Sequence, residues 1–509
     1  MTAHDTPPAE MTALLTRAEH SGYTETSSHA DVMDFVSQLQ SRHDPRLHVA
    51  YFGTSPEGRA LPLLVLSGRG LHTPEQAHAS GIPVVLVICG IHAGEVEGKE
   101  AALMWVRDLL GGAQGDVLDH CTLVVVPLFN ADGNERLSPE NRALDLSRLS
   151  GQDGPALVGT RNTAAGINLN RDYIRQEAAE SRLLQQQVYL RWNPHLTIDC
   201  HATNGSIHRY ALTYDIPHTE HSGRREPVAY MRERMMPAVQ EAVRQRDGLD
   251  LFWYGNFVRD EGGQGQGWIT YTHHPRFGCN YRGLGNRLDL LLEAYAYISF
   301  RERVAVTYAV LREALRYVAQ HAEEIVALLA ECSMPPDEVA VRYRLDPYPD
   351  HSVRVLTREP YTLHGNPIEV DVPHYAHFVP TAVVPRPWAY AVPGALAGFL
   401  RGHGLTLTRM ASGTPLEVEV PLMQGMVSEP GPGILESQAS THWDTRWMPG
   451  RRALPEGWCV VETQQPRGAV AVYLCEAGSD DGIVSNGLLG EPVPGQEWPV
   501  WRILRSPQG

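Results

Sequence analysis

The sequence lacks the features that mark membrane-spanning, exported and nucleic-acid-binding proteins. No apolar run reaches the roughly 18 uncharged residues that a bilayer requires. The first residues, MTAHDTPPAE, have neither the positive start nor the apolar stretch of a secretory signal. The formal net charge is -16 at pH 7 and no basic stripe is present, which argues against binding to a phosphate backbone. We therefore expect a cytoplasmic protein that binds neither membrane nor nucleic acid.

Cysteine is also scarce and shows no pattern. The 509 residues include seven cysteines, scattered along the chain without a C-x-x-C pair. This spacing indicates neither a disulfide framework nor a thiolate zinc cluster. Several of the cysteines lie in apolar runs, where we expect them to pack as small buried hydrophobic residues.

What the sequence does contain, up to about residue 330, is an alternation of short apolar runs and longer helix-like segments. Six runs predict strands: LHVAYFG, LPLLVL, PVVLVIC, TLVVVPL, HLTIDC and LDLLLE. Helices are predicted at 98–110, 178–192 and 227–246. Continuous apolar runs are typical of strands buried on both faces, so we expect an α/β fold with a mixed, largely parallel sheet sandwiched by helices.

The chain is longer than one hydrophobic core usually supports, and the sequence predicts where it divides. A long helical segment over 301–332 is broken by SMPPDE, because consecutive prolines cannot continue a helix. We therefore expect one domain over 1–334 and a second over 335–509. Short Val-rich runs in the second part, PLEVEVPL, GWCVVET and GAVAVYL, are separated by Pro and Gly and predict a β-rich domain, to which no role is assigned.

Polar residues follow two of the predicted strands where each strand ends. His92 and Glu95 come after PVVLVIC, and His201 comes after HLTIDC. Open α/β sheets bind ligands at the carboxyl ends of their strands. Two imidazoles and a carboxylate suit Zn²⁺, and three protein ligands leave a fourth position for water. Each residue alone is more often a hydrogen-bonded histidine or a helix-terminal charge, so the prediction of one zinc ion per chain depends on their coincidence.

Two further segments supply the other groups that a metal-dependent hydrolase needs. Glu293 ends the run LDLLLE, so its carboxylate should emerge at the same edge of the sheet and serve as a general base. Asn170 and Arg171, in GINLNRDY, place an amide beside a guanidinium that can hold a planar carboxylate. Metal, base and carboxylate clamp together predict the cleavage of an amide next to a free acid.

Taken together, these motifs resemble those of the carboxypeptidase A-like zinc carboxypeptidases. The resemblance covers about residues 21–297 and is carried by HAGE, NADGNER, NLNRDY, DCH and a late Glu that ends an apolar strand, in that order. It implies that the zinc ligands are His92, Glu95 and His201. It also implies that Glu293 is the general base and that Asn170 and Arg171 hold the terminal carboxylate. The tail resembles the extension of a bacterial subgroup of these peptidases.

Two catalytic roles of the family are harder to place on this sequence. A mobile tyrosine covers the substrate in the family. Spacing from Glu293 points to Tyr271, whereas the local pattern CNYRGLGNR favours Tyr281, which is our prediction. The arginine that polarises the carbonyl falls on Asp145 by spacing, so Arg142 or Arg161 must supply it.

The expected partner of one zinc-binding histidine also differs from the family. An aspartate often stands two residues before the clamp asparagine and orients a zinc-binding histidine; here Asn168 occupies that position. An amide can accept the same hydrogen bond but brings no charge, which predicts weaker tuning of the histidine.

These observations predict a zinc-dependent hydrolase that removes the C-terminal amino acid from a peptide. The same machinery would serve a deacylase or amidase of N-acyl amino acids or small modified peptides, so the expected substrate is a peptide or acyl-amino acid with a free carboxylate. A catalytically silent metal- or peptide-binding protein is the third alternative, because Asn168 and the unplaced arginine depart from the family.

Overall fold

The computed structural model describes residues 14–259, 265–429 and 440–506, and an eight-stranded sheet lies at the centre of its first part. The strand order is β1-β2-β4-β3-β5-β10-β6-β7. Strands β4, β3, β5 and β10 run parallel to one another, and antiparallel pairs lie on both sides of them. The bounds are β1 Leu47–Thr54, β2 Ala60–Leu66, β3 Val84–Cys89, β4 Thr122–Val126, β5 Leu196–Thr203, β6 Leu212–Asp215, β7 Leu251–Trp253 and β10 Leu288–Tyr295.

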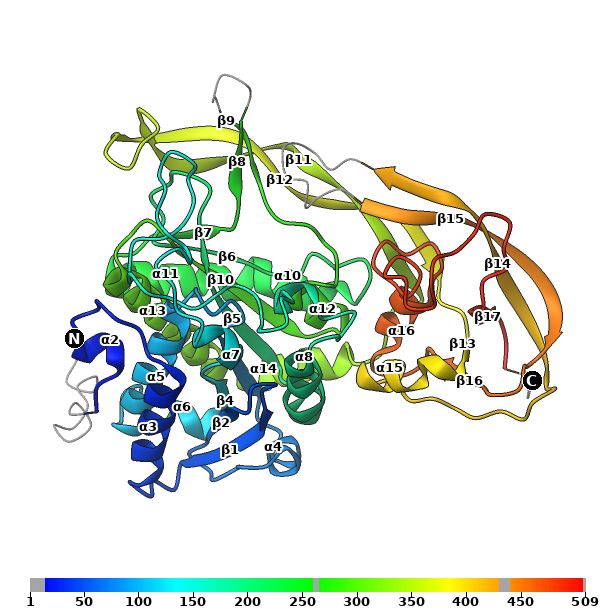
Figure 1. The fold of residues 1–509 in the computed structure, drawn as a ribbon, viewed down its shortest axis with the longest axis horizontal. Coiled ribbons are helices and arrows are strands. Elements are labelled where there is room, and N and C mark those ends of the chain that lie inside the picture. The colour runs from blue at the N-terminus through cyan, green and yellow to red at the C-terminus, as the bar shows by residue number, and fades with distance from the viewer. Residues whose placement is uncertain (1–13, 260–264, 430–439, 507–509) are drawn as a thin grey trace.

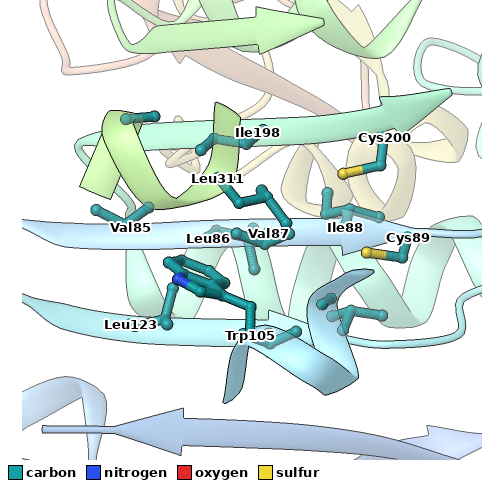
Figure 2. Close-up of a cluster of buried hydrophobic side chains, with 14 of the residues drawn as sticks. Val85, Leu86, Val87, Ile88, Cys89, Trp105, Leu123, Ile198, Cys200 and Leu311 are labelled. Atoms are coloured by element: carbon teal, nitrogen blue, oxygen red, sulfur yellow. The ribbon is translucent and has the colours of Figure 1, made fainter. Parts of the chain in front are cut away.

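The central strands are rich in apolar residues because both faces of the sheet are covered. Every residue of β3, β4 and β5 is buried. Figure 2 shows β3 between β5 and β4, with Trp105 of helix α5 and Leu311 of helix α13 packed against it. This confirms the predicted mixed sheet between helices.

Helices surround this sheet (Figure 1). The longest is α13, Phe300–Gln320, which packs against α5, Glu97–Leu110, and α11, Met236–Asp247. The other α-helices in the described residues of this part are α2 Arg17–His20, α3 His29–Gln40, α4 Pro74–Ser80, α6 Val117–His120, α7 Ala131–Asn134, α8 Ala179–Leu183, α9 Leu190–Trp192, α10 Arg225–Tyr230, α12 Gly278–Leu284 and α14 Ala322–Glu331. None of the helices in the described residues is long and apolar enough to cross a bilayer.

Two further sheets build the C-terminal part, as the sequence predicts. A long ribbon of β11, Glu338–Glu359, and β12, Asn366–Pro385, runs along one side of the molecule (Figure 1). It continues a four-stranded sheet through β9, Gly265–Ile269, and β8, Asn256–Arg259, so this sheet draws strands from both sides of residue 334. The last sheet has the order β15-β14-β17-β13-β16, with β13 Ala389–Pro393, β14 Pro415–Glu429, β15 Ser440–Ala453, β16 Trp458–Glu462 and β17 Trp501–Ile503.

One predicted strand of the C-terminal part is a helix. The run GAVAVYL belongs to α16, Gly468–Cys475, and α15, Ala397–Gly402, is a second helix in this part. All eight residues of α16 are buried. A fully buried helix has no polar face, so its sequence cannot be distinguished from a buried strand by periodicity.

Candidate active site

The carboxyl ends of β3 and β5 bring the three predicted metal ligands together. The two strands are parallel neighbours in which Cys89 lies opposite Cys200, so His201 lies beside the turn that leaves β3. That turn begins at Gly90, whose φ of 70° is a left-handed conformation that favours glycine. His92 and Glu95 follow in the turn, before α5 begins.

The potential ligand atoms of these residues converge. His92 Nδ1 lies 3.1 Å from Glu95 Oε1, and His201 Nδ1 lies 3.0 Å from Glu95 Oε2. The two Nδ1 atoms are 3.2 Å apart, and all three side chains are buried. Two imidazole nitrogens and a carboxylate that face one point form a donor set that fits a zinc ion. The residues that the sequence predicts as ligands therefore lie where one ion can contact all of them.

The outer nitrogens of both histidines have partners of different charge. His92 Nε2 lies 3.0 Å from Asn168 Oδ1, the position at which the sequence predicts an amide in place of a carboxylate. His201 Nε2 lies 3.1 Å from Asp199 Oδ1, and Arg282 donates to the other oxygen of Asp199 at 3.1 Å. Sequence reasoning missed Asp199, although a residue two positions earlier on a strand points to the same face as His201.

Both candidate arginines reach the carboxylate of Glu95. Arg142 Nη1 lies 2.9 Å from Glu95 Oε1, and Arg161 Nη1 lies 3.1 Å from the same oxygen. Arg142 also donates to the side chain of Gln152 at 2.6 Å and to the carbonyl of Ala202 at 3.1 Å. The Arg161 side chain is 45% exposed, whereas that of Arg142 is 15% exposed. Arg161 is therefore the less constrained of the two.

A cavity of about 720 Å³ opens beside the three ligands. It is lined by both arginines and by the predicted base and clamp residues Glu293, Asn170 and Arg171. Glu293 lies on β10 directly opposite His201 of β5. Burial raises the pKa of the Glu293 carboxyl to about 8, although the charge of His201 opposes the shift. Nine residues were predicted as catalytic, substrate-binding or metal-binding, and eight of them line this cavity or belong to the ligand group beside it.

The clamp residues are held by the segment that precedes α12. The Arg171 guanidinium lies 3.7 Å above the centre of the Phe277 ring, and it donates to the carbonyl of Asn170 at 2.7 Å. The side-chain oxygen of Asn170 accepts a hydrogen bond from Gly278 N at 2.9 Å. Burial and the charge of Arg161 lower the pKa of Arg171 to about 10, so the guanidinium stays charged at neutral pH.

Tyr281, predicted to cover the substrate, lies elsewhere. It is fully buried in α12, its hydroxyl shares a hydrogen bond of 2.7 Å with His403 Nδ1, and Gln185 donates to it at 3.0 Å. Helix α12 turns this side chain toward the C-terminal part, so it is not among the residues that line the cavity. Tyr271 lines the cavity instead. The spacing from Glu293 therefore pointed to the tyrosine that lines the cavity, Tyr271, whereas the local sequence pattern pointed to Tyr281, which does not.

The cavity also contains two tyrosines that sequence reasoning did not single out. Tyr254 follows β7, and Tyr361 comes from the connection between β11 and β12 in the C-terminal part. The Tyr361 hydroxyl accepts a hydrogen bond from Ile207 N at 2.7 Å. No local signal marks Tyr361, because its place in the cavity depends on how the β11–β12 ribbon docks.

Comparisons with known proteins agree with this geometry. Residues 32–210 match a family model described as Zinc carboxypeptidase. Over these residues the chain is similar to the zinc carboxypeptidases. The family match contains His92, Glu95 and His201, and it ends before Glu293.

Individual proteins of this kind have low sequence identity to the chain. Human Carboxypeptidase A6 is 28% identical over 124 residues, which cover 23% of this chain and 26% of that protein, so the chain spans about a quarter of its length. A metallo-carboxypeptidase from Burkholderia cenocepacia is 19% identical with a TM-score of 0.42, covering 58% of this chain and 70% of that one. A metallo-carboxypeptidase from Pseudomonas aeruginosa, in complex with (2-guanidinoethylmercapto)succinic acid, is 18% identical with a TM-score of 0.41, covering 59% and 70%.

Proposed function

We propose that this protein is a zinc-dependent carboxypeptidase that removes the C-terminal amino acid from a peptide. The observation that carries the proposal is one cavity that combines a convergent His92–Glu95–His201 donor set with a partly buried carboxyl, Glu293, and a charged guanidinium, Arg171. These are the groups needed to hydrolyse an amide that lies next to a free carboxylate.

Arg171 is suited to hold the terminal carboxylate of the substrate. Within the part of the chain that the structure describes, no ion pair joins it to an Asp or Glu side chain, and its ring contact with Phe277 fixes the plane of the guanidinium. A planar, charged fork matches a carboxylate through two parallel hydrogen bonds. Asn170 lines the same end of the cavity and offers an amide beside this fork.

Glu293 is suited to move the proton. When bound by His92, Glu95 and His201, a zinc ion supplies Lewis acidity toward water and the scissile carbonyl, and a positive charge that favours the ionised form of Glu293. The Glu293 carboxylate then takes a proton from the attacking water and returns it to the nitrogen of the leaving amino acid. Its place opposite His201 puts it beside the reacting groups.

Arg161 is the better candidate for stabilising the negative charge that develops on the carbonyl oxygen. Arg142 is anchored by Gln152 and by the Ala202 carbonyl and therefore holds Glu95 in position. Among the described residues, the Arg161 side chain forms an ion pair only with Glu95, and it is half-exposed, so it can turn toward a substrate oxygen.

A deacylase or amidase of N-acyl amino acids is the second candidate function. Tyr361 favours it, because the C-terminal part contributes this side chain to the cavity wall and thereby limits the space for a long peptide. Both functions need the same metal, base and clamp, so substrate profiling must separate them. A panel of peptides and N-acyl amino acids, each with a free or amidated C-terminus, is the appropriate comparison.

Replacing the proposed base tests the assignment. Glu293→Gln keeps the shape of the side chain but cannot accept the proton, so we expect zinc content to remain and kcat to fall by roughly two to four orders of magnitude. Glu313→Gln is a matched control, since Glu313 is a buried carboxylate of α13 outside the cavity. Near-normal turnover by Glu293→Gln would exclude this base. Stoichiometric zinc without hydrolysis of any substrate by the unaltered protein would favour a silent binding protein.

A further inference from the structure

A second group of buried histidine and carboxylate side chains joins two distant segments. His273 and His274 lie between β9 and α12, and Asp480 lies after α16. Atoms of these residues that could bind a metal all lie within 4.8 Å of one another, and all three side chains are buried. None of the three lines the cavity beside His92 and Glu95, so the proposed hydrolysis leaves them unexplained.

Two neighbouring hydroxyl groups hold the atoms that face away from this cluster. Thr272 Oγ1 shares a hydrogen bond with His274 Nδ1, and the Tyr473 hydroxyl donates to Asp480 Oδ1 at 2.7 Å. His274 Nε2 and Asp480 Oδ2 are therefore the atoms left to face the cluster. Metal-binding histidines and carboxylates usually have their outer atoms fixed in this way, as at the first centre.

The distances within the cluster bracket those of a tetrahedral site. His273 Nε2 lies 2.7 Å from Asp480 Oδ2, and His274 Nε2 lies 4.0 Å from the same oxygen. Bonds of about 2.0–2.1 Å to zinc separate neighbouring ligand atoms by about 3.3 Å, between these two values. The imidazole rings are stacked at 4.5 Å and 24°, an arrangement in which both Nε2 atoms can point the same way. One ion could bind all three side chains. Without it, His273 bonds to Asp480 while His274 is too far from Asp480 to form a hydrogen bond.

The charges around the cluster also favour a cation. Asp480 and its neighbour Asp481 are both fully buried. Arg276 neutralises Asp481, through an ion pair of 2.9 Å and a backbone hydrogen bond of 2.7 Å. Asp480 has no guanidinium or ammonium partner among the described residues and depends on the two imidazoles. A buried carboxylate in this position gains most from a positive charge bound directly to it.

We propose that His273, His274 and Asp480 bind a second divalent transition-metal ion, with zinc as the ion that suits two nitrogen donors and one oxygen donor. The ion joins the segment between β9 and α12 to the C-terminal part. That segment also carries Tyr271 and Phe277, which line the cavity, so the ion holds one cavity wall in place. The existence of this site does not depend on the proposed peptidase activity.

Zinc content of the full-length protein tests the proposal. After loading with zinc and removal of free metal, we expect two equivalents per chain in the unaltered protein, measured by mass spectrometry of the metal. His274→Gln and Asp480→Asn should each retain one equivalent, and His92→Gln/His201→Gln should also retain one. His208→Gln, which changes a buried histidine outside both clusters, is the matched control and should retain two.

The second site would be excluded if the unaltered protein held one equivalent of zinc and the His92→Gln/His201→Gln variant held none. This pair of measurements also decides the matter if His274→Gln and Asp480→Asn fail to fold. A titration of metal-free protein with Co²⁺ gives an independent count, because the visible bands should saturate at two equivalents in the unaltered protein and at one in His274→Gln.

Discussion

At the scale of single residues, the two histidines of the first centre differ in the charge behind them. Asp199 carries a negative charge to the outer nitrogen of His201, whereas Asn168 presents a neutral amide oxygen to that of His92. A carboxylate in that position makes a histidine a stronger ligand and fixes its tautomer. We therefore expect His92 to be the weaker zinc ligand of the two histidines.

This difference predicts the effect of changes at Asn168. Asn168→Asp supplies the missing charge while keeping an oxygen for His92 and for Asn170 N, so we expect zinc affinity to rise by up to about tenfold. Asn168→Ala removes the partner and should lower affinity by about 10- to 100-fold. Competition with a coloured chelator measures both. Equal affinities in the three proteins would show that this oxygen does not tune the centre.

Tyr281 and Tyr271 should respond in opposite ways to removal of their hydroxyl groups. Tyr281→Phe leaves Gln185 without this buried partner and leaves His403 Nδ1 with only the 3.3 Å contact to Gln176, so the free energy of unfolding should fall by about 1–3 kcal/mol while kcat stays unchanged. Tyr271→Phe alters a cavity residue and should instead raise KM. Denaturant unfolding and steady-state kinetics on the same samples separate the two effects. A loss of turnover in Tyr281→Phe with unchanged stability would restore it as the covering tyrosine.

The residues that could be predicted from the sequence are those whose position depends on strand ends. His92, Glu95 and His201 follow buried apolar runs, and parallel strands deliver such residues to one edge of the sheet. Arg142 and Arg161 come from a long connection without periodic pattern, so the sequence could not rank them. Their ranking needed the hydrogen bonds that anchor Arg142.

At the scale of elements, the sequence predicted the strands of the central sheet well. It did not predict a fully buried helix or the short strands that form by pairing with distant segments. All six apolar runs assigned as strands in the first part contribute to the central sheet. The runs of the inner strands fit strands covered on both faces, whereas the edge strand β1 is partly exposed. The run GAVAVYL became α16, since burial on all sides removes the periodicity that distinguishes helix from strand. The short strands β6 and β7 were missed; they pair with β10 and with each other, and such short runs carry little periodic signal.

The close approach of α5 to β5 sets the position of Glu95 relative to His201, and it predicts a stability difference between two glycines. A Cβ at Gly98 of α5 would lie 2.5 Å from Cys200 Cβ, so Gly98→Ala should lower the free energy of unfolding by about 1–3 kcal/mol. Gly398→Ala is the matched control on α15, where a Cβ meets nothing within 4 Å and should stabilise the helix by roughly 0.5–1 kcal/mol. Chemical denaturation measures both, and an unchanged Gly98→Ala protein would mean that the two elements can separate at no cost.

At the scale of the whole molecule, the two parts predicted from the sequence contact each other through a common apolar cluster and a common sheet. One apolar cluster contains Tyr173 and Leu284 from the first part and Val470 and Tyr473 from α16. Arg467 of the C-terminal part donates to the carbonyl of His403 and lies over rings of the first part. The sequence indicated the break near residue 334 through its prolines, but it could not reveal that strands from both sides complete one sheet.

This shared core predicts that the chain unfolds as a unit. Separating the two parts would expose the apolar cluster around Tyr173 and Tyr473 and would break the pairing of β9 with β12, so neither part gains by melting first. We expect a single heat-absorption peak in calorimetry, with a van't Hoff enthalpy close to the calorimetric one. Two well-separated peaks would contradict this expectation. Fluorescence of the tryptophans on both sides of residue 334 should report the same midpoint, because cooperative loss of one core removes the order around all of them.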